Sequence, residues 1–353
     1  MIENLKENIK NLPFFFVVGR ARSGTTLLRY LLEAHPNIIF PQEADFIITL
    51  ANKYQKKTVW EEKHLMEFYN DVIHYPKFQF WHIDEEYLQK TLLKFKGNST
   101  YADICKAVYY CFISNNPKEN ILWLGDKNPV YSLHLKKLLI LFPDSKFIHL
   151  CRDVRDNVVS MRKTRFERSF FPTLAYRWGY YVRKISRMQK KFPEKFFHLR
   201  YEDLVADTEN KLKEICTFLQ IPYSNKMPGY YENLRESIQS YPKELLEKYH
   251  VSLLEPLNTK QVDKWKNVLT KKQIQIIEQC AGKSIEKMGY NKENCKMPFY
   301  LYLYCLPGLL YGWMQFPVIR FINLFPFTMK TRMVNFVAAI FKQELNKFRK
   351  KPL

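Results

Sequence analysis

A short polar loop near the N-terminus has the residue types that bind an anion. It follows an apolar run, PFFFVV, and leads into LLRYLL, whose leucines have helical spacing. Backbone N–H groups at the start of a helix attract anions because they point outward at the positive end of the helix dipole. Arg22 adds a cation, and Gly24 lets a ligand approach the backbone closely. The loop therefore predicts an anion site, with hydroxyl donors from Ser23, Thr25 and Thr26.

The glycine spacing of this loop matches a nucleotide triphosphate P-loop, but the lysine of that motif is missing. Four residues separate Gly19 from Gly24, and Thr25 stands where the lysine belongs. Without that lysine, a magnesium-assisted grip on the β- and γ-phosphates is disfavoured, and a shorter, diphosphate-like anion fits better. A P-loop kinase is the alternative, in which Asp153 after an apolar run would bind magnesium.

A second stretch, FIHLCRDVRDNVVSMRKTR, concentrates arginines around a predicted strand end. Arg152 ends the strand, and Ser160 lies eight residues later in the first turns of the next helix. Guanidinium forks match phosphate oxygens, and a nearby hydroxyl can complete the contact. The alternative for each arginine is a salt bridge with Asp153 or Asp156. This pattern predicts a second anion site.

Strands and helices alternate through the first two thirds of the chain. Such alternation predicts an α/β fold, a P-loop-like parallel sheet flanked by helices. Ligands on parallel sheets bind beyond the carboxyl ends of the strands, where both arginine-bearing stretches fall. The region 46–115 has a mostly helical pattern. The expected strands lie within residues 13–19, 37–40, 121–129, 145–153 and 195–207.

Four blocks of the sequence resemble, in the same order, the sulfotransferases that use 3′-phosphoadenosine 5′-phosphosulfate (PAPS). GRARSGTTLL and RDVRDNVVS resemble the two cofactor motifs of that family. LRYEDLVADTENKLKEICTFLQIPY resembles its later strand-and-helix block, and VDKWKNVLT the Trp-Lys segment that closes over the cofactor. The resemblance implies the sulfotransferase fold and transfer of a sulfuryl group from PAPS to an acceptor hydroxyl, with no metal required.

The same resemblance assigns the cofactor contacts. It implies that the loop residues hold the 5′-phosphosulfate, and that Arg152 and Ser160 hold the 3′-phosphate. Tyr201 would lie near the adenine, and Lys264 belongs to the closing segment. The loop residues concerned are Arg22, Ser23, Gly24, Thr25 and Thr26.

The pattern is most similar to the tyrosylprotein sulfotransferases and their bacterial relatives. There the Arg-Ser-Gly-Thr-Thr loop is followed by Ala-His-Pro and a glutamate base, which places Glu43 in that role. GDKNP similarly resembles the family's lysine block and points to Lys127. Glu43 would deprotonate the acceptor, its pKa raised by an apolar pocket. Arg22 and Lys127 would stabilise charge on the transferring group.

Bland alternatives exist for these catalytic candidates. Glu43 can be a solvated loop carboxylate and Lys127 a turn lysine. Many cytosolic relatives use a histidine base, so the aromatic segment offers a second set of candidates. That set is His64, His74 and His82.

The acceptor is expected from composition and not from a motif. The regions 46–115 and 166–182 and the C-terminal tail are rich in aromatic residues. Apolar walls favour a hydrophobic alcohol such as a sterol or lipid, ahead of a glycan and then a peptide tyrosine. One departure from the tyrosylprotein pattern makes a peptide tyrosine a less favoured acceptor. Thr164 stands where those relatives have arginine, with Arg165 alongside.

A compositional change near residue 296 divides the chain into a predicted sulfotransferase domain, 1–295, and a hydrophobic and basic C-terminal segment, 296–353. Residues 297–319 carry no charge, a length that could span a bilayer. Three prolines in this stretch make a straight spanning helix doubtful. Aromatic rings with lysines suit the membrane interface, so we expect peripheral membrane contact through 297–353. The alternative is an aromatic subdomain packed on the core.

The composition indicates an anionic partner and a reducing compartment. With 56 Lys and Arg against 35 Asp and Glu, the net charge is +21. No nucleic-acid recognition motif appears, so a nucleic-acid-binding module is a less favoured alternative. The seven scattered cysteines are not typical of a disulfide framework. The N-terminal MIENLKENIKNLP lacks the apolar core of a signal peptide, and we expect a first helix in a cytoplasmic protein, peripheral at the inner face of the membrane.

Overall fold

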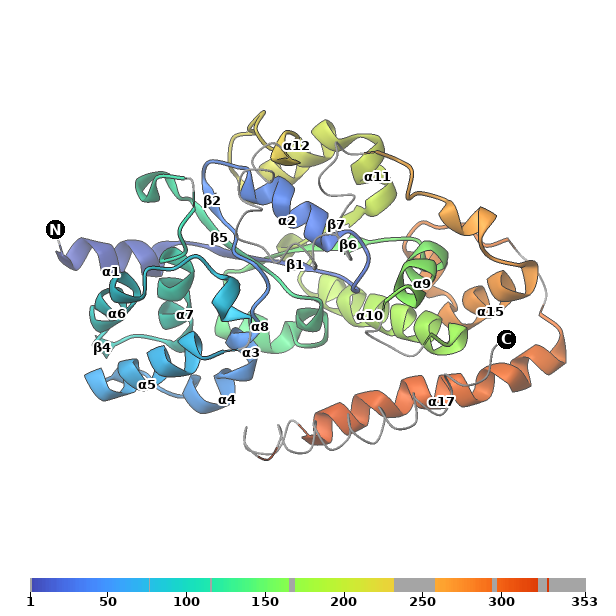
Figure 1. The fold of residues 1–353 in the computed structure, drawn as a ribbon, viewed down its shortest axis with the longest axis horizontal. Coiled ribbons are helices and arrows are strands. Elements are labelled where there is room, and N and C mark those ends of the chain that lie inside the picture. The colour runs from blue at the N-terminus through green and yellow to red at the C-terminus, as the bar shows by residue number, and fades with distance from the viewer. Residues whose placement is uncertain are drawn as a thin grey trace.

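A five-stranded parallel sheet forms the centre of the molecule in this computed structural model, in the order β2-β5-β1-β6-β7 (Figure 1). Every neighbouring pair is parallel, so all five carboxyl ends meet at one edge. The predicted α/β class and parallel sheet are confirmed. The strands are β1 (Phe14–Val18), β2 (Ile38–Ile39), β5 (Trp123–Lys127), β6 (Lys146–Cys151) and β7 (Phe196–Arg200). The structure describes residues 2–75, 77–114, 116–164, 169–231, 258–293, 297–322 and 329.

The central strand β1 is apolar on both faces because each face is covered. Its alternate residues point into different hydrophobic clusters, Phe14 and Phe16 into one, Phe15 and Val17 into the other. On the second face lie α2 (Thr25–Glu33), α11 (Tyr201–Ala206) and α12 (Thr208–Leu219). On the first lie α8 (Leu135–Leu141) and the long α10 (Phe171–Lys191), as Figure 1 shows.

The region between β2 and β5 is mostly helical, as its pattern predicts. Its helices bury a dense aromatic core that includes Trp60, Tyr101 and Tyr109. A short antiparallel pair, β3 (Val59–Trp60) with β4 (Gly97–Asn98), is set into it. The helices here are α3 (Phe46–Thr49), α4 (Ala51–Tyr54), α5 (Glu62–Ile73), α6 (Glu85–Leu93) and α7 (Tyr101–Tyr110), and α1 (Ile2–Asn11) packs against α7.

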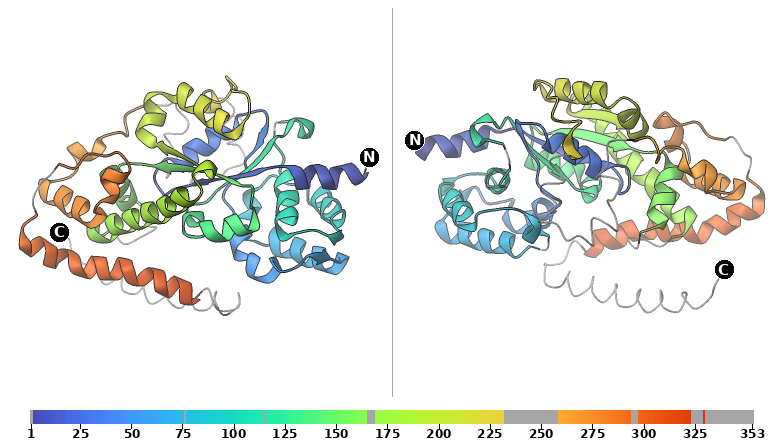
Figure 2. Two further views of the ribbon diagram at one scale, coloured as in Figure 1. Left: turned by 180° about the vertical axis from the view of Figure 1, so that it is seen from behind. Right: turned by 45° about the horizontal axis from the view of Figure 1, so that its top comes forward.

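A third cluster lies beyond β6 and joins segments that are distant in the sequence. It contains α9 (Val154–Arg162), part of α10, α15 (Lys271–Ala281) and α16 (Ser284–Lys287). The last described helix, α17 (Phe299–Ile322), lies along α10 and α15 on the side away from α12 (Figures 1 and 2). The 3-10 turns are η1 (Phe78–Phe80), η2 (Lys118–Asn120), η3 (Pro129–Leu133), η4 (Pro193–Lys195) and η7 (Lys264–Asn267).

Two C-terminal expectations differ from the structure or stay untested. Pro307 and Pro317 lie inside α17, which nevertheless runs for 24 residues. No helix in the described part of the chain combines the length and apolarity needed to cross a membrane. The predicted boundary at 296 falls in residues 294–296, which lie outside the described residues, as does 330–353. The division into two segments stays a prediction.

Candidate functional site

The polar loop joins β1 to α2 in a conformation that its glycine permits. Gly24 caps α2 with a φ of 92°, and a Cβ there would lie 2.4 Å from the ring of Tyr201. Both the backbone and the space therefore require glycine at this position. Arg22 also has a left-handed φ, 67°, which is uncommon for a residue with a side chain. Strained backbone of this kind is common in ligand-binding loops. The absence of a side chain at Gly24 also lets the Tyr201 ring pack directly against the loop.

The loop is joined to α9 through two side chains of that helix. Arg22 Nε donates to Ser160 Oγ at 3.1 Å, so the two predicted anion motifs meet. Asn157, one turn earlier on α9, donates to the Ala21 carbonyl at 2.9 Å and to Ser23 Oγ at 3.2 Å. The sequence analysis missed Asn157, although its spacing of three from Ser160 puts both on one helix face.

Arg152 ends β6 and is buried against Tyr201. Its guanidinium lies 4.7 Å from the Tyr201 ring centre, and Nη2 donates to the Gln261 carbonyl at 2.5 Å. Asp156 lies 3.9 Å from the same nitrogen. Arg152 Nε has no hydrogen-bond partner among the described residues. A buried charged donor of this kind is what a phosphate oxygen would satisfy.

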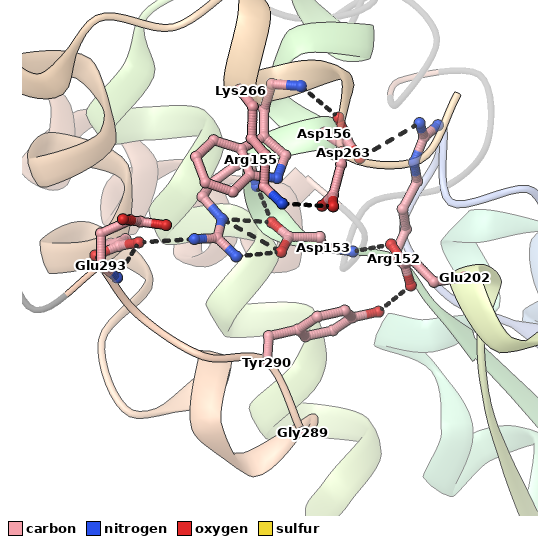
Figure 3. A network of polar contacts seen from close by, with 12 residues as sticks. Arg152, Asp153, Arg155, Asp156, Glu202, Asp263, Lys266, Gly289, Tyr290 and Glu293 are labelled. Carbon is pink, nitrogen blue, oxygen red and sulfur yellow. Dashed lines mark hydrogen bonds and ion pairs between the residues drawn. The ribbon is translucent and has the colours of Figure 1, made fainter. Parts of the chain in front are cut away.

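A network of ion pairs and hydrogen bonds connects the residues that follow Arg152 with Glu202, Glu278 and Tyr290 (Figure 3). Arg155 pairs with Asp153 at 2.5 Å and with Glu278 at 3.0 Å, and all three are buried. Glu202 accepts from the Asp153 backbone N–H at 3.0 Å and from the Tyr290 hydroxyl at 2.7 Å. Asp153 is therefore held by an arginine and caps α9, which disfavours the magnesium-binding role of the kinase alternative.

The closing segment reaches this network through its tryptophan. The Trp265 backbone N–H donates to Asp156 at 2.9 Å, and the Arg155 guanidinium lies 3.9 Å from the Trp265 ring centre. Trp265 Nε1 is buried and has no hydrogen-bond partner among the described residues. Lys264, the predicted contact, is half-buried in η7 directly before it.

Lys127 and Glu43 meet at the ends of β5 and β2. Lys127 Nζ forms an ion pair with Glu43 Oε1 and donates to Thr26 Oγ1 of the loop at 3.1 Å. A second cation, Lys77, has its Nζ 3.7 Å from Glu43 Oε2. The Lys127 side chain is 2% exposed and that of Glu43 32%, so the pair has one buried and one accessible member. The structure thus brings both catalytic candidates to the anion loop.

The pKa of Glu43 differs from the expected direction. Burial alone would raise this pKa, but Lys127 and then Lys77 outweigh burial and hold it below its ordinary value. Burial lowers the pKa of Lys127, and its attraction to Glu43 opposes that change. The sequence analysis predicts an apolar pocket around Glu43, whereas its surroundings are cationic. In this state the carboxylate is ionised and neutralised by a lysine.

A buried carboxyl beneath Lys127 was also missed by the sequence analysis. Asp126 Oδ2 accepts from the hydroxyls of Tyr109 and Tyr131, each at 2.5 Å. Burial raises the pKa of Asp126 to about 7. Tyr131 also donates to the Ala44 carbonyl at 3.4 Å, next to Glu43. Tyr131 thus links Asp126 of β5 to the loop that carries Glu43. No sequence pattern indicated this, because the partners lie on different elements.

Two of the alternative histidine bases, His64 and His74, have local structural roles. His64 completes the capping box of α5 with Glu61. His74 Nδ1 lies 2.9 Å from the Asn70 carbonyl at the end of the same helix.

Thr164, which stands where the tyrosylprotein sulfotransferases have arginine, donates to the Met161 carbonyl at 2.8 Å. Arg165 lies outside the described residues.

The aromatic segments proposed as acceptor walls are largely interior. Phe78 and Trp81 are only 5% and 6% exposed and belong to the main core, and Trp81 Nε1 donates to the Gln42 carbonyl at 2.9 Å. Phe171 and Trp178 of α10 are buried in the third cluster. Their periodicity reflects packing and not a ligand pocket, because large aromatics bury the most apolar surface.

The site residues fit an adenosine bisphosphate with an attached sulfuryl group. Donors gather at two places, the loop with Lys127 and the Arg152–Ser160 stretch, and buried donors are left for a ligand at the second. The described residues contain no group of three His, Cys, Asp or Glu side chains arranged to hold a metal. Anion binding is thus the chemistry that the geometry offers.

Comparisons with known proteins agree with this architecture. The protein-tyrosine sulfotransferase of Drosophila melanogaster is 24% identical over 264 residues, covering 72% of this chain and 47% of that protein. Protein-tyrosine sulfotransferase 1 of Danio rerio is 24% identical over 261 residues, covering 72% of this chain and 66% of that protein. The chain therefore spans less than two thirds of the length of these relatives.

A solved structure and a family model complete the comparison. The sulfotransferase domain from the Synechococcus PCC 7002 olefin synthase superposes with a TM-score of 0.54 at 22% identity, covering 80% of this chain and 96% of that domain, which shows a shared fold. The model of the sulfotransferase family matches residues 13–225. Because that match extends over more than half of the chain, this protein belongs to the sulfotransferase family.

Proposed function

We propose that this protein transfers a sulfuryl group from PAPS to the hydroxyl of an acceptor. The observation that carries the proposal is the position of Lys127, whose Nζ contacts both Thr26 of the anion loop and the Glu43 carboxylate. One cation thus lies between an anion-binding backbone and a base, which is where charge develops when a sulfuryl group moves to an oxygen. PAPS supplies the activated sulfuryl group and a nucleotide leaving group.

The two donor groups have separate roles in this proposal. Ser23, Thr25 and Thr26, with the N–H groups at Gly24, hold the 5′ end of the cofactor beside Arg22. Arg152 and Ser160 hold the 3′-phosphate, with Tyr201 packed between the two ends and Lys264 covering them. The Arg22–Ser160 hydrogen bond supports this arrangement, because it joins a residue proposed for the 5′ end to one proposed for the 3′-phosphate.

Glu43 would act as the general base, and the ion pair with Lys127 is its resting state. Cofactor oxygens beside the loop would attract Lys127 and weaken its hold on Glu43. The pKa of Glu43 would then rise, since the lysines are what keep it low. The carboxylate would gain basicity only when the sulfuryl donor is in place.

For the acceptor we propose a hydrophobic alcohol such as a sterol or lipid. The aromatics of α10 and η1 do not support this acceptor, because they are buried, and its support is the exposed apolar surface of α17. A tyrosyl peptide is the second candidate, because the relatives above are named protein-tyrosine sulfotransferases. Lys77 beside Glu43 would favour acidic side chains around such a tyrosine. A glycan is the third candidate acceptor.

The deciding experiment is sulfuryl transfer from labelled PAPS to sterols, lipids, glycans and tyrosyl peptides, without added metal. Wild type is compared with Glu43→Gln and with Glu86→Gln, a change of an exposed glutamate on α6. We expect product with one acceptor class, lost in Glu43→Gln and retained in Glu86→Gln. Full activity of Glu43→Gln would remove Glu43 as the base. Phosphoryl transfer from ATP and magnesium, with none from PAPS, would overturn the proposal in favour of a kinase.

A further inference from the structure

The last described helix, α17, has two apolar sides that differ in their surroundings. One side packs on the body of the protein, and it contains Leu301, Cys305, Gly308, Gly312 and Phe316 at helical spacing. The opposite side carries large apolar residues that are about half exposed or more. They include Leu303, Leu306, Leu310, Trp313, Met314 and Phe321, exposed by 54, 50, 57, 58, 54 and 57%. A helix that is apolar all round is normally buried or in contact with lipid.

The inner side of α17 is firmly joined to α10. Thr173 Oγ1 donates to the Gly308 carbonyl at 2.9 Å, and Arg177 donates to Gln315 at 2.8 Å. The rings of Tyr180 and Phe316 stack with centres 3.7 Å apart. Gly308 permits this approach, since a Cβ there would lie 2.5 Å from the Phe170 ring. The helix therefore cannot turn its outer side inward without losing these contacts.

The charge along the chain indicates what covers the outer side. Residues 297–319 carry no charge, whereas residues 320–353 contain eight Lys or Arg and one Glu. A second copy of the chain on this surface would bring two strongly basic segments together. An anionic lipid surface would instead attract them, at about 1 kcal/mol per basic residue near the surface. Tyrosine and tryptophan, frequent on the outer side, prefer the membrane–water interface.

We propose that the outer side of α17 docks in the interface of an anionic membrane, with the helix lying parallel to the bilayer plane. Its apolar side chains would enter the headgroup boundary while α10 stays in water. This docking is independent of the proposed activity, although it would bring the enzyme to a lipid acceptor. Figure 2 shows that α17 lies along one border of the molecule, on the side away from α11 and α12.

Trp313 gives a direct spectroscopic test on the full-length chain. The other five tryptophans, all described, are at most 7% exposed, while Trp313 is 58% exposed. Anionic vesicles of phosphatidylglycerol and phosphatidylcholine should shift the emission to the blue, and brominated lipid should quench it. Trp313→Phe should abolish the lipid-dependent change but keep binding, since phenylalanine is also apolar. Vesicles of phosphatidylcholine alone, or high salt, should weaken binding because screening removes the electrostatic part.

A matched pair of double variants tests the surface by sedimentation with the same vesicles. Leu303→Ser with Leu310→Ser removes two outer leucines and should lower the partition coefficient roughly 100-fold, about tenfold per leucine. Ile113→Ser with Ile140→Ser removes two equally exposed apolar residues elsewhere, at 57 and 67%, and should leave binding unchanged. Circular dichroism and thermal unfolding establish that both variants fold.

Three results would overturn the docking proposal. The first is wild type that stays in the supernatant with anionic vesicles. The second is equal binding by the two double variants. The third is Trp313 emission that is already blue-shifted and protected from quenchers in the absence of lipid. A dimer mass would then mean that a second copy covers α17, and a monomer mass that another part of the same chain does.

Discussion

The two halves of the candidate site hold their buried cations in different ways. At the β6–α9 half, Arg155 lies between Asp153 and Glu278, and all three side chains are no more than 7% exposed. At the β5 half, Lys127 is as deeply buried, but its partner Glu43 has 32% of its side chain exposed. In the first arrangement a ligand cannot reach the charged groups, because all of them are buried. In the second, a ligand can reach Glu43. One half would anchor the cofactor while the other changes partners during the reaction.

Removing the charge of Arg155 should have the largest effect, on stability. Arg155→Met leaves Asp153 and Glu278 buried without their cation, which should cost about 3–5 kcal/mol in the free energy of unfolding. Urea unfolding measures it. As a control, Lys213→Met breaks an exposed pair with Glu209 and should leave that free energy nearly unchanged, because solvent screens such a pair. Similar values for both variants would mean that the network does not behave as a closed unit.

Lys127→Met should instead affect the reaction. We expect kcat/KM for sulfuryl transfer to fall by about 10²–10³, because a donor to the transferring group is lost. The Kd of adenosine 3′,5′-bisphosphate should change much less, since that ligand lacks the sulfuryl group. Lys136→Met, an exposed lysine on α8, serves as the control. An equal loss of bisphosphate binding would make Lys127 an anchor and remove the contrast between the halves.

Asp126 should make the free energy of unfolding depend on pH, because it is a buried carboxyl that is bound by tyrosines and not by a cation. Its pKa is raised from 3.8 to about 7 when the protein folds. Between those values the folded state binds more protons than the unfolded state, so stability falls as pH rises and then levels off. Relative to Asp126→Asn, wild type should lose up to about 1.4 kcal/mol of unfolding free energy per pH unit in that range. Parallel stability profiles of the two proteins from pH 4 to 8 would contradict this account.

The smallest effect should come from the hydroxyl that joins the halves. Ser160→Ala removes the acceptor for Arg22 Nε and the hydroxyl that we propose as a donor to the 3′-phosphate. A net hydrogen bond is worth about 1 kcal/mol, so the Kd of the bisphosphate should rise ~5-fold in calorimetry. Thr217→Ala, whose hydroxyl donates to the Lys213 carbonyl one turn earlier in α12 at 2.9 Å, should leave the Kd unchanged. No change in Ser160→Ala would place the 3′-phosphate elsewhere.

Much of the fold was predictable from local patterns. The strand ends at Val18, Lys127 and Cys151 follow apolar runs, and parallel strands with helical connections must bring those ends to one edge. The glycine loop was also predictable, because Gly24 before a leucine-rich helix is a local signal. These predictions succeed because period, turn chemistry and strand direction are properties of short segments.

The electrostatics of the site could not be predicted in the same way. The raised pKa expected for Glu43 was wrong in direction, because Lys127 and Lys77 arrive from distant segments. The same limit applies to Phe78 and Trp81, whose aromatic pattern fits both a binding wall and a core. Only the packing of α7 and the loop after β2 decides between them.

By itself, the sequence determined the parallel α/β layout, the glycine loop between β1 and α2 and the basic stretch after β6, since each depends on residues close together in the chain. The tertiary structure decided which polar side chains pair, as Arg22 donates to Ser160 and Lys127 forms an ion pair with Glu43 across more than 80 residues. It also decided which side of α17 faces water. Coulomb and packing energies depend on distances in space, and those distances exist only once the chain has folded.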